Sequence, residues 1–181
     1  MITALSEKDL LQRCRNGDTS AFRAIVEVYY THLYRVAFAL SLDEDDASDI
    51  VQDTLVKAWR GLRAFRGEAS LKTWLTRLTL NAARDHARRQ HTRQRTLMHW
   101  NDGKTGVEDA SNLVSNQDEL HRALMRLSLS EQRIVALRFG LDLPIKEIAQ
   151  VLECPEGTAK SRLHSAMRTL RTAMKIEGST P

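Results

Sequence analysis

Apolar residues recur with the period of an α-helix at both ends of this 181-residue chain, and this pattern limits the possible folds more than any other feature. In the first half it predicts helices over about residues 18 to 40, residues 45 to 62 and from Ser70 onward, after a short helix that ends at Gly17. From Glu119 it predicts four more helices with very short joints. Because runs of strand-forming residues are scarce, we expect an all-α protein.

The helical pattern fails in one internal stretch, between about His91 and Gln117. The segment NDGKTGVEDASN within it is rich in turn-forming residues. Roughly 25 residues without periodicity would be unusual inside a compact domain. We therefore predict two small helical domains, residues 5–92 and residues 118–176, joined by a flexible linker of residues 93–117.

Residue spacing argues against several classes of protein. Cys14 and Cys154 lie far apart and show no CxxC or Cys/His ligand spacing, so neither a disulfide framework nor a metal site is expected. No apolar run approaches the roughly 18 residues needed to cross a bilayer, and the acidic Glu7 and Asp9 argue against a signal peptide. We expect a cytoplasmic protein that does not insert into the membrane.

The sequence also gives no support to an enzyme. His86 and His91 lack ligand spacing, no Ser/His/Asp order is recognisable, and the glycines form no phosphate-binding loop. We therefore predict no catalytic activity and no cofactor. The net charge of +4 and the pI of about 9.3 make an acidic partner plausible, but the distribution of the charge has to decide this.

The segment LPIKEIAQVLECPEGTAKSRLHSAMRTLR has the spacing of a helix-turn-helix. Pro144 and Pro155 each suit the start of a helix, where the missing N–H group costs nothing. Only about three residues, 153 to 155, separate the end of the first helix from the start of the second. The small Ala149 allows the close approach that two steeply crossing helices need.

The second helix of this pair sorts its side chains onto two sides. The side predicted to face a core comprises Ala159, Leu163, Ala166, Met167, Leu170 and Met174. The opposite side comprises Lys160, Ser161, His164, Ser165, Arg168 and Arg171. Any surface helix exposes some lysine and arginine, but a basic side directly after a tight helix-turn favours binding in the major groove of duplex DNA.

Two helices of the first domain carry opposite charges. Residues 43–53 include six carboxylates and no basic residue, whereas residues 77–95 include six arginines against the single acidic residue Asp85. A solvated helix end is the alternative explanation for either pattern. A calcium-binding loop is excluded because Thr54 stands where a Glu ligand would be needed.

Three stretches in this order resemble the extracytoplasmic-function group of the sigma-70 family of RNA polymerase sigma factors: DASDIVQDTLVKAW, FRGEASLKTWLTRLTLNAARDHARR and the helix-turn-helix segment. The resemblance covers about residues 6–91 and 118–175. It implies a protein that binds core RNA polymerase and promoter DNA, directs promoter-specific initiation in a stress response, and is held in check by an anti-sigma factor. The alternative is a repressor or activator that binds its operator as a dimer without polymerase.

The resemblance also implies roles for individual residues. Contacts with the clamp helices of the largest polymerase subunit are expected from Asp46, Asp49, Gln52, Asp53, Val56 and Lys57. Contacts with the minus-10 element, including a flipped base in the FRGEAS loop, are expected from Phe65, Arg66, Arg77, Asn81, Arg84 and Arg88. Contacts with the minus-35 duplex are expected from Thr158, Lys160, Ser161, Arg162, His164, Ser165 and Arg168.

Some positions depart from the family pattern or have two possible roles. Glu153 stands in the turn where the family often has Gly, so a strained joint is expected. Ser165 replaces a frequent Arg, and Cys154 is expected to be a buried small apolar residue rather than a redox switch. Phe65 and Trp74 are the aromatic candidates for stacking on bases, although the position of Trp74 in its helix fits a core role better.

Overall fold

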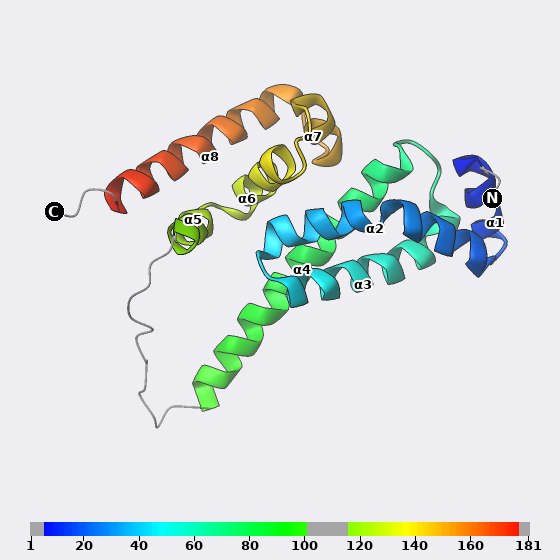
Figure 1. Cartoon of the computed structure of the whole chain (residues 1–181), viewed down its shortest axis with the longest axis horizontal. Helices are drawn as coiled ribbons and strands as arrows, with labels where there is room; N and C mark the ends of the chain where they lie inside the picture. Colours follow the sequence, from blue (N-terminus) through cyan, green and yellow to red (C-terminus); the bar gives the residue numbers. More distant parts are fainter. Residues whose placement is uncertain (1–5, 101–115, 178–181) are drawn as a thin grey trace. The chain divides into compact units, whose positions relative to one another are not determined.

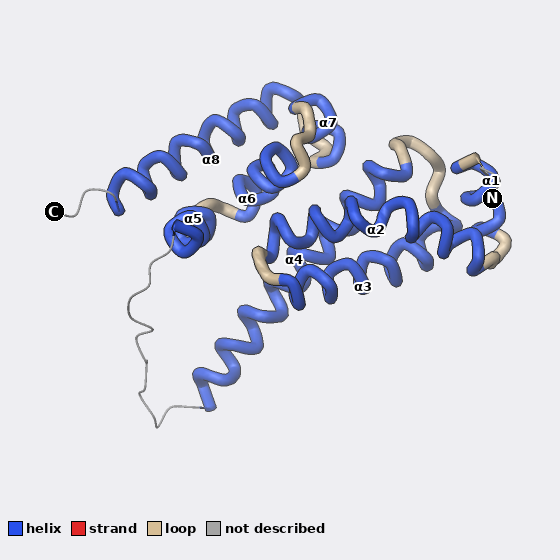
Figure 2. Tube along the Cα trace, viewed as in Figure 1, coloured by secondary structure: helices blue, strands red, loops and turns tan. Residues whose placement is uncertain are grey.

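A computed structural model gives the fold of the chain and describes residues 6–100 and 116–177. The N-terminal part contains α1 (Glu7–Arg15), α2 (Thr19–Ser41), α3 (Glu44–Gly61), the 3-10 turn η1 (Leu62–Ala64) and α4 (Leu71–Trp100) (Figure 1). The C-terminal part contains α5 (Asn116–Met125), α6 (Leu129–Val135), the π-helical turn η2 (Ala136–Gly140), α7 (Ile145–Val151) and α8 (Glu156–Glu177). The described residues form helices and loops without a strand (Figure 2), which confirms the all-α prediction.

The chain divides into two compact units, Met1–Ala83 and Arg84–Pro181, with the boundary inside α4. Each unit has its own hydrophobic core. Within the described residues, no helix combines the length and the apolar character that crossing a membrane requires.

In the N-terminal unit, α2 and α3 form an antiparallel pair on which α1 and the start of α4 pack. The side chains that are almost completely buried at its centre are Leu33, Ile50, Leu62, Leu71 and Leu75. Ala37, Ala47 and Ala58 have no exposed surface, and their small side chains let the helices approach closely. This packing fixes which side of α3 and of α4 faces outward.

Acidic side chains start two of these helices. The Asp18 carboxylate accepts hydrogen bonds from the N–H groups of Ser20 and Ala21 at 2.8 and 3.2 Å, and Asp43 accepts one from the N–H of Asp46 at 2.9 Å. The hydrogen bond from the Ser20 hydroxyl, followed by that from Arg13, holds the pKa of Asp18 well below its ordinary value. The capped ends therefore agree with the helix starts that the sequence predicts near residues 18 and 45.

The end of α1 has the hydrogen bonds of a Schellman turn. Gly17 adopts a φ of +87°, and its N–H donates to the carbonyl of Cys14 at 2.9 Å. The next N–H, of Asp18, donates to the carbonyl of Arg13 at 3.1 Å. Glycine at this position has no Cβ to clash in the left-handed conformation, so the turn forms without strain.

The joint of the helix-turn-helix repeats this geometry without glycine. Glu153 adopts a φ of +52°, and its N–H donates to the carbonyl of Gln150 at 3.3 Å. The N–H of Cys154 donates to the carbonyl of Ala149 at 3.0 Å. Because a side chain with a Cβ is disfavoured in the left-handed region, this turn is the strained joint that the sequence led us to expect.

The C-terminal unit packs α6 and α7 against α8. The Ser128 hydroxyl and the Glu131 carboxylate form a capping box at the start of α6. The most deeply buried side chains of the unit include Ile134, Leu137, Ile148, Ala159 and Ala166. Both Ala149 and Ala159 are nearly fully buried, and α7 and α8 pack against each other.

Three expectations from the sequence need correction. Residues 93–100, which we assigned to the linker, continue α4, because this stretch holds good helix formers and no Gly or Pro before residue 101. Met174, which the sequence places in the core, is 46% exposed, whereas the neighbouring Ala173 is buried. Cys154 is half-buried rather than buried, and the rest of the proposed linker, residues 101–115, lies outside the described residues.

The strained turn makes a prediction about stability. Glu153→Gly should raise the unfolding free energy of the C-terminal unit by about 1 kcal/mol relative to Glu153→Ala, because only glycine relieves the left-handed backbone. Native-state hydrogen exchange of α7 and α8 measures this difference. Gly17→Ala makes the opposite change in the equivalent turn after α1. It should destabilise the N-terminal unit by about the same amount, because it places a Cβ in the left-handed region. Equal stability of the Glu153→Gly and Glu153→Ala proteins would show that the turn carries no strain.

Candidate nucleic-acid and protein interfaces

The last helix, α8, has one buried and one exposed side, as predicted. Ala159, Ala166, Leu170 and Ala173 are buried against the rest of the C-terminal unit. The exposed residues include Lys160, Ser161, Arg162, His164, Arg168 and Arg171. A row of cationic and hydrogen-bonding side chains on a straight helix is what the phosphates and base edges of a DNA groove require.

Two residues that we predicted on this surface, Thr158 and Ser165, are half-buried rather than exposed. The Ser165 hydroxyl is half-buried and donates to the Glu131 carboxylate at 2.8 Å, which joins α8 to the first turn of α6. The side-chain and backbone hydrogen bonds from Ser128, and then the one from Ser165, lower the pKa of Glu131. Thr158 is also half-buried, and its carbonyl accepts the Ser161 hydroxyl at 3.0 Å.

The contact between Ser165 and Glu131 gives this serine a structural role in the C-terminal unit. The serine hydroxyl reaches the Glu131 carboxylate at 2.8 Å, a contact that its short side chain allows. The sequence could not show this, because the two residues are 34 positions apart and only the fold brings them together.

The acidic helix α3 also has two distinct sides. Ala47, Ile50, Val51, Thr54 and Ala58 are buried, and the Thr54 hydroxyl donates to the carbonyl of Ile50 at 2.7 Å. Asp45, Asp49, Gln52 and Val56 are exposed. Asp46, Asp53 and Lys57 are half-buried at the edges of this side. We call the exposed and half-buried set, residues 45, 46, 49, 52, 53, 56 and 57, the acidic face.

The acidic face combines negative charge with an apolar side chain. Val56 is 49% exposed and lies among these carboxylates. Carboxylates around an exposed apolar residue suit a protein partner with basic and apolar side chains rather than a nucleic acid.

The basic residues of α4 and of the preceding loop are mostly accessible. Arg66, Asn81, Arg84 and Arg88 are exposed, whereas Arg77 is half-buried. The loop that precedes α4 turns at Gly67, which has a φ of +78° and open space around it. The Ser70 hydroxyl accepts the N–H of Thr73 at 3.1 Å and caps α4.

The ring of Phe65 is not displayed for stacking on bases. It is only 8% exposed and lies against the ring of Trp74, with 5.0 Å between the ring centres. Trp74 in turn lies close to Gly61, where an added Cβ would come within 3.1 Å of the indole. Both aromatic residues therefore belong to the core at the base of the loop, as expected for Trp74 and contrary to the expectation for Phe65.

One histidine helps to hold α4 in place. The Nε2 of His32 on α2 is 2.9 Å from the Thr76 hydroxyl, and that hydroxyl donates its own proton to the carbonyl of Lys72 at 2.8 Å. The imidazole therefore donates through Nε2. Burial, followed by the positive charges of Lys72 and Arg35, lowers the pKa of His32 from 6.5 to about 4.

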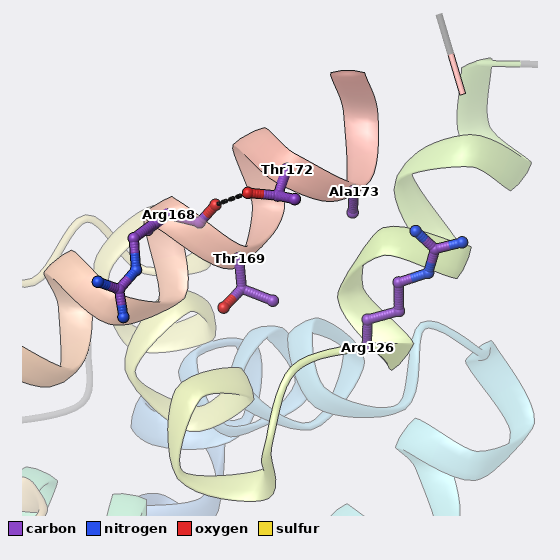
Figure 3. A pocket seen from close by; sticks show the side chains of 5 residues that line it. All are labelled: Arg126, Arg168, Thr169, Thr172 and Ala173. Atoms are coloured by element: carbon purple, nitrogen blue, oxygen red, sulfur yellow. Dashed lines mark hydrogen bonds between the residues drawn. The ribbon is translucent and has the colours of Figure 1, made fainter. Parts of the chain in front are cut away.

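A cavity of about 300 Å³ opens on the C-terminal unit (Figure 3). It is lined by Arg126 from the turn after α5 and by Arg168, Thr169, Thr172 and Ala173 from α8. The Thr172 hydroxyl donates to the carbonyl of Arg168 at 3.0 Å, as Figure 3 shows. The lining offers guanidinium groups but no nucleophile with a base beside it, and sequence reasoning missed Arg126 because it precedes the helix-turn-helix.

The described residues do not hold a metal site either. Among them, no group of three or more His, Cys, Asp or Glu side chains is arranged to bind a metal ion.

Comparison with known proteins finds the same family in both halves of the chain. The family model of Sigma-70 region 2 matches residues 25–93, and the model of Sigma-70 region 4 matches residues 117–170. Together the two matches cover more than half of the chain.

Relatives with assigned names match over almost the full length. The RNA polymerase sigma-H factor of Pseudomonas aeruginosa is 27% identical, with 97% of each chain covered. The ECF RNA polymerase sigma-E factor of Escherichia coli K12 is 29% identical, with 94% of this chain and 95% of the relative covered.

Solved structures share the fold. The sigma factor RpoE from Bartonella quintana, in complex with the anti-sigma factor NepR, matches with a TM-score of 0.63 and 25% identity, covering 86% of this chain and 97% of that one. CnrH, in complex with the cytosolic domain of CnrY, matches with a TM-score of 0.65 and 22% identity, covering 94% of this chain and 97% of that one.

The environment of His32 predicts a pH dependence. Between pH 6.5 and about 4 the unfolded chain binds a proton on this imidazole that the folded chain does not, so stability is lost as the pH falls through this window. We expect a loss of about 1 to 2 kcal/mol, since the partial exposure of the ring screens the full effect. Trp59 and Trp74 report the unfolding of the N-terminal unit by fluorescence in denaturant titrations.

The control is His32→Gln, which keeps a donor for Thr76 but does not titrate. Carboxylates elsewhere in the unit contribute equally to both proteins, so the difference between them isolates the imidazole. Identical pH profiles for the two proteins would contradict this interpretation.

Proposed function

The chain belongs to the sigma-70 family of RNA polymerase sigma factors, in its extracytoplasmic-function group, and we propose that it binds core RNA polymerase and directs initiation at specific promoters. The observation that carries this proposal is that α3 has an acidic face, whereas α4 and α8 each expose basic residues. The protein makes or breaks no covalent bond in this role. It acts by binding the opened promoter more tightly than the closed one.

The acidic face of α3 is proposed to dock on the clamp helices of the largest polymerase subunit. Asp49 and Gln52 are exposed at its centre, and Val56 supplies an apolar contact. Opposite charges across such an interface accelerate association and set its register, while the buried apolar contact adds affinity.

The basic side of α4 and the loop before it are proposed to bind the minus-10 element. Asn81, Arg84 and Arg88 recur on one side of the helix with helical spacing and are exposed. Arg66 and Gly67 at the tip of the loop leave space for an unstacked base. Phe65 is not part of this proposal because its ring is buried.

The exposed side of α8 is proposed to bind the minus-35 duplex. Lys160, Ser161 and His164 lie in the first turns of the helix, where base edges are read in a helix-turn-helix. Arg162 and Arg168 flank them and suit phosphate contacts. Ser165 is proposed to brace α8 against α6 rather than to contact DNA.

An anti-sigma factor is the proposed regulator. The support is the structure of RpoE from Bartonella quintana in complex with the anti-sigma factor NepR, which this chain matches over 86% of its length. A protein of this class would keep the factor inactive until a stress releases it. Because its proposed partners are polymerase and promoter DNA, we place the chain in the cytoplasm.

A polymerase-binding assay tests the acidic face. Asp49→Arg should weaken binding to core RNA polymerase by roughly tenfold or more, because like charges would then face each other across the interface. Run-off transcription from a cognate promoter should fall in parallel at limiting factor concentration. Glu27→Arg makes the same charge change on an exposed position of α2 and should leave both unchanged.

Two outcomes would overturn the proposed function. The first is a wild-type protein that binds no core polymerase and yields no promoter-specific transcript. The second is tight operator binding by a dimer of the protein alone, which would favour a repressor or activator.

Salt dependence tests the contribution of α8 to phosphate binding. Lys160→Gln should reduce the slope of log binding constant against log salt concentration by about 0.9 for holoenzyme on a minus-35 duplex, which is the value for one lost phosphate contact. Fluorescence anisotropy at several KCl concentrations gives the slope. Lys8→Gln on α1 removes a charge of the same kind and should leave the slope as it is.

A further inference from the structure

We propose that Arg15 on α1 is a positioning residue for DNA melting, because it fixes the base of the loop that carries Arg66, Gly67 and Glu68. This inference rests on the proposed function of that loop. It concerns a helix outside the segment that matches Sigma-70 region 2, which begins at residue 25. The inference is therefore about a part of this chain to which the family model assigns nothing.

The contact itself is short and links distant parts of the chain. The guanidinium Nη2 of Arg15 donates to the carbonyl oxygen of Phe65 at 2.7 Å, across 50 positions of sequence. Phe65 terminates the 3-10 turn η1, so its carbonyl is the acceptor at the point where the loop departs. Charge-assisted hydrogen bonds of this length are stronger than those between neutral groups.

Arg15 is presented from a helix that is itself held at both ends. Ser6 and Asp9 form a capping box at its start, and the glycine turn at Gly17 closes its end. Leu11 and Cys14 are buried in the core of the unit. A further tie is the hydrogen bond of 2.6 Å that the Tyr29 hydroxyl donates to the Glu7 carboxylate.

The two ends of the loop are thus anchored by different means. At the first end, the Phe65 ring packs on Trp74 and the Phe65 carbonyl binds Arg15. At the second end, Ser70 caps α4. Between these anchors, Arg66, Gly67 and Glu68 are exposed.

The ring contact alone does not determine the direction of the loop. A ring against a ring restrains the side chain, whereas a hydrogen bond to the carbonyl restrains the peptide plane that precedes Arg66. Without Arg15 this peptide plane would rotate more freely, and the tip would lose its fixed orientation toward a flipped base. A binding loop that is preorganised loses less conformational entropy when its ligand arrives.

Limited proteolysis without DNA tests whether the hydrogen bond from Arg15 to the Phe65 carbonyl restrains the loop. We expect trypsin to cleave after Arg66 about fivefold faster in Arg15→Ala than in the wild type, since the lost hydrogen bond comes from an exposed arginine, and contact with water reduces its net contribution. Mass spectrometry of the fragments identifies this cleavage site. Arg23→Ala removes an exposed arginine from α2 and serves as the control for charge, and Arg15→Lys should restore most of the protection.

Binding to single-stranded oligonucleotides tests the functional consequence. Wild-type holoenzyme should prefer the matched minus-10 strand over a strand with the flipped base replaced, and in Arg15→Ala that preference should fall about fivefold. Affinity for core polymerase and the melting temperature of the full chain should stay close to the wild-type values. A general folding defect would move all of these quantities together.

The outcomes separate this inference from the proposed function. Equal cleavage after Arg66 in the wild type and in Arg15→Ala would overturn the inference that Arg15 positions the loop. Unchanged base preference in Arg15→Ala would overturn it as well. A wild-type holoenzyme that binds every strand equally would overturn the proposed function of the loop, while the cleavage rates would still decide whether Arg15 holds it.

Discussion

The burial of one side of each functional helix is the constraint on which the surfaces of this protein depend. In α3 the residues Ala47 and Ala58 have no exposed area, and in α8 the same is true of Ala159 and Ala166. Because side chains follow each other at about 100° around a helix, fixing the alanine side also fixes which charged residues face outward. The acidic face of α3 and the basic side of α8 are thus determined by packing before any partner binds.

Short polar contacts then fix the orientation of these helices. The bond from Ser165 to Glu131 ties α8 to α6, and the bond from His32 to Thr76 ties α2 to α4. The left-handed turn at Glu153 sets the joint between α7 and α8. These contacts involve few atoms, but they hold each helix in a defined orientation within its unit.

The sequence was a good guide to local structure and a poor one to long-range contacts. Helical periodicity and Pro144 and Pro155 located the helix-turn-helix, and the exposure of Asp49 and Lys160 agrees with their predicted faces. The predictions for Phe65 and Ser165 missed their internal contacts, because these depend on residues 9 and 34 positions away. Periodicity also placed the end of α4 too early, since residues 93–100 continue the helix without a regular apolar stripe.

The most direct test of the account is site-specific crosslinking within an assembled promoter complex. A photoreactive amino acid replaces Val56 on the acidic face in one protein and Ser161 on α8 in another. The account predicts that position 56 crosslinks to the largest polymerase subunit with or without DNA, and that position 161 crosslinks to duplex DNA near minus 35. Crosslinks from position 56 to DNA, or from position 161 to polymerase alone, would contradict it.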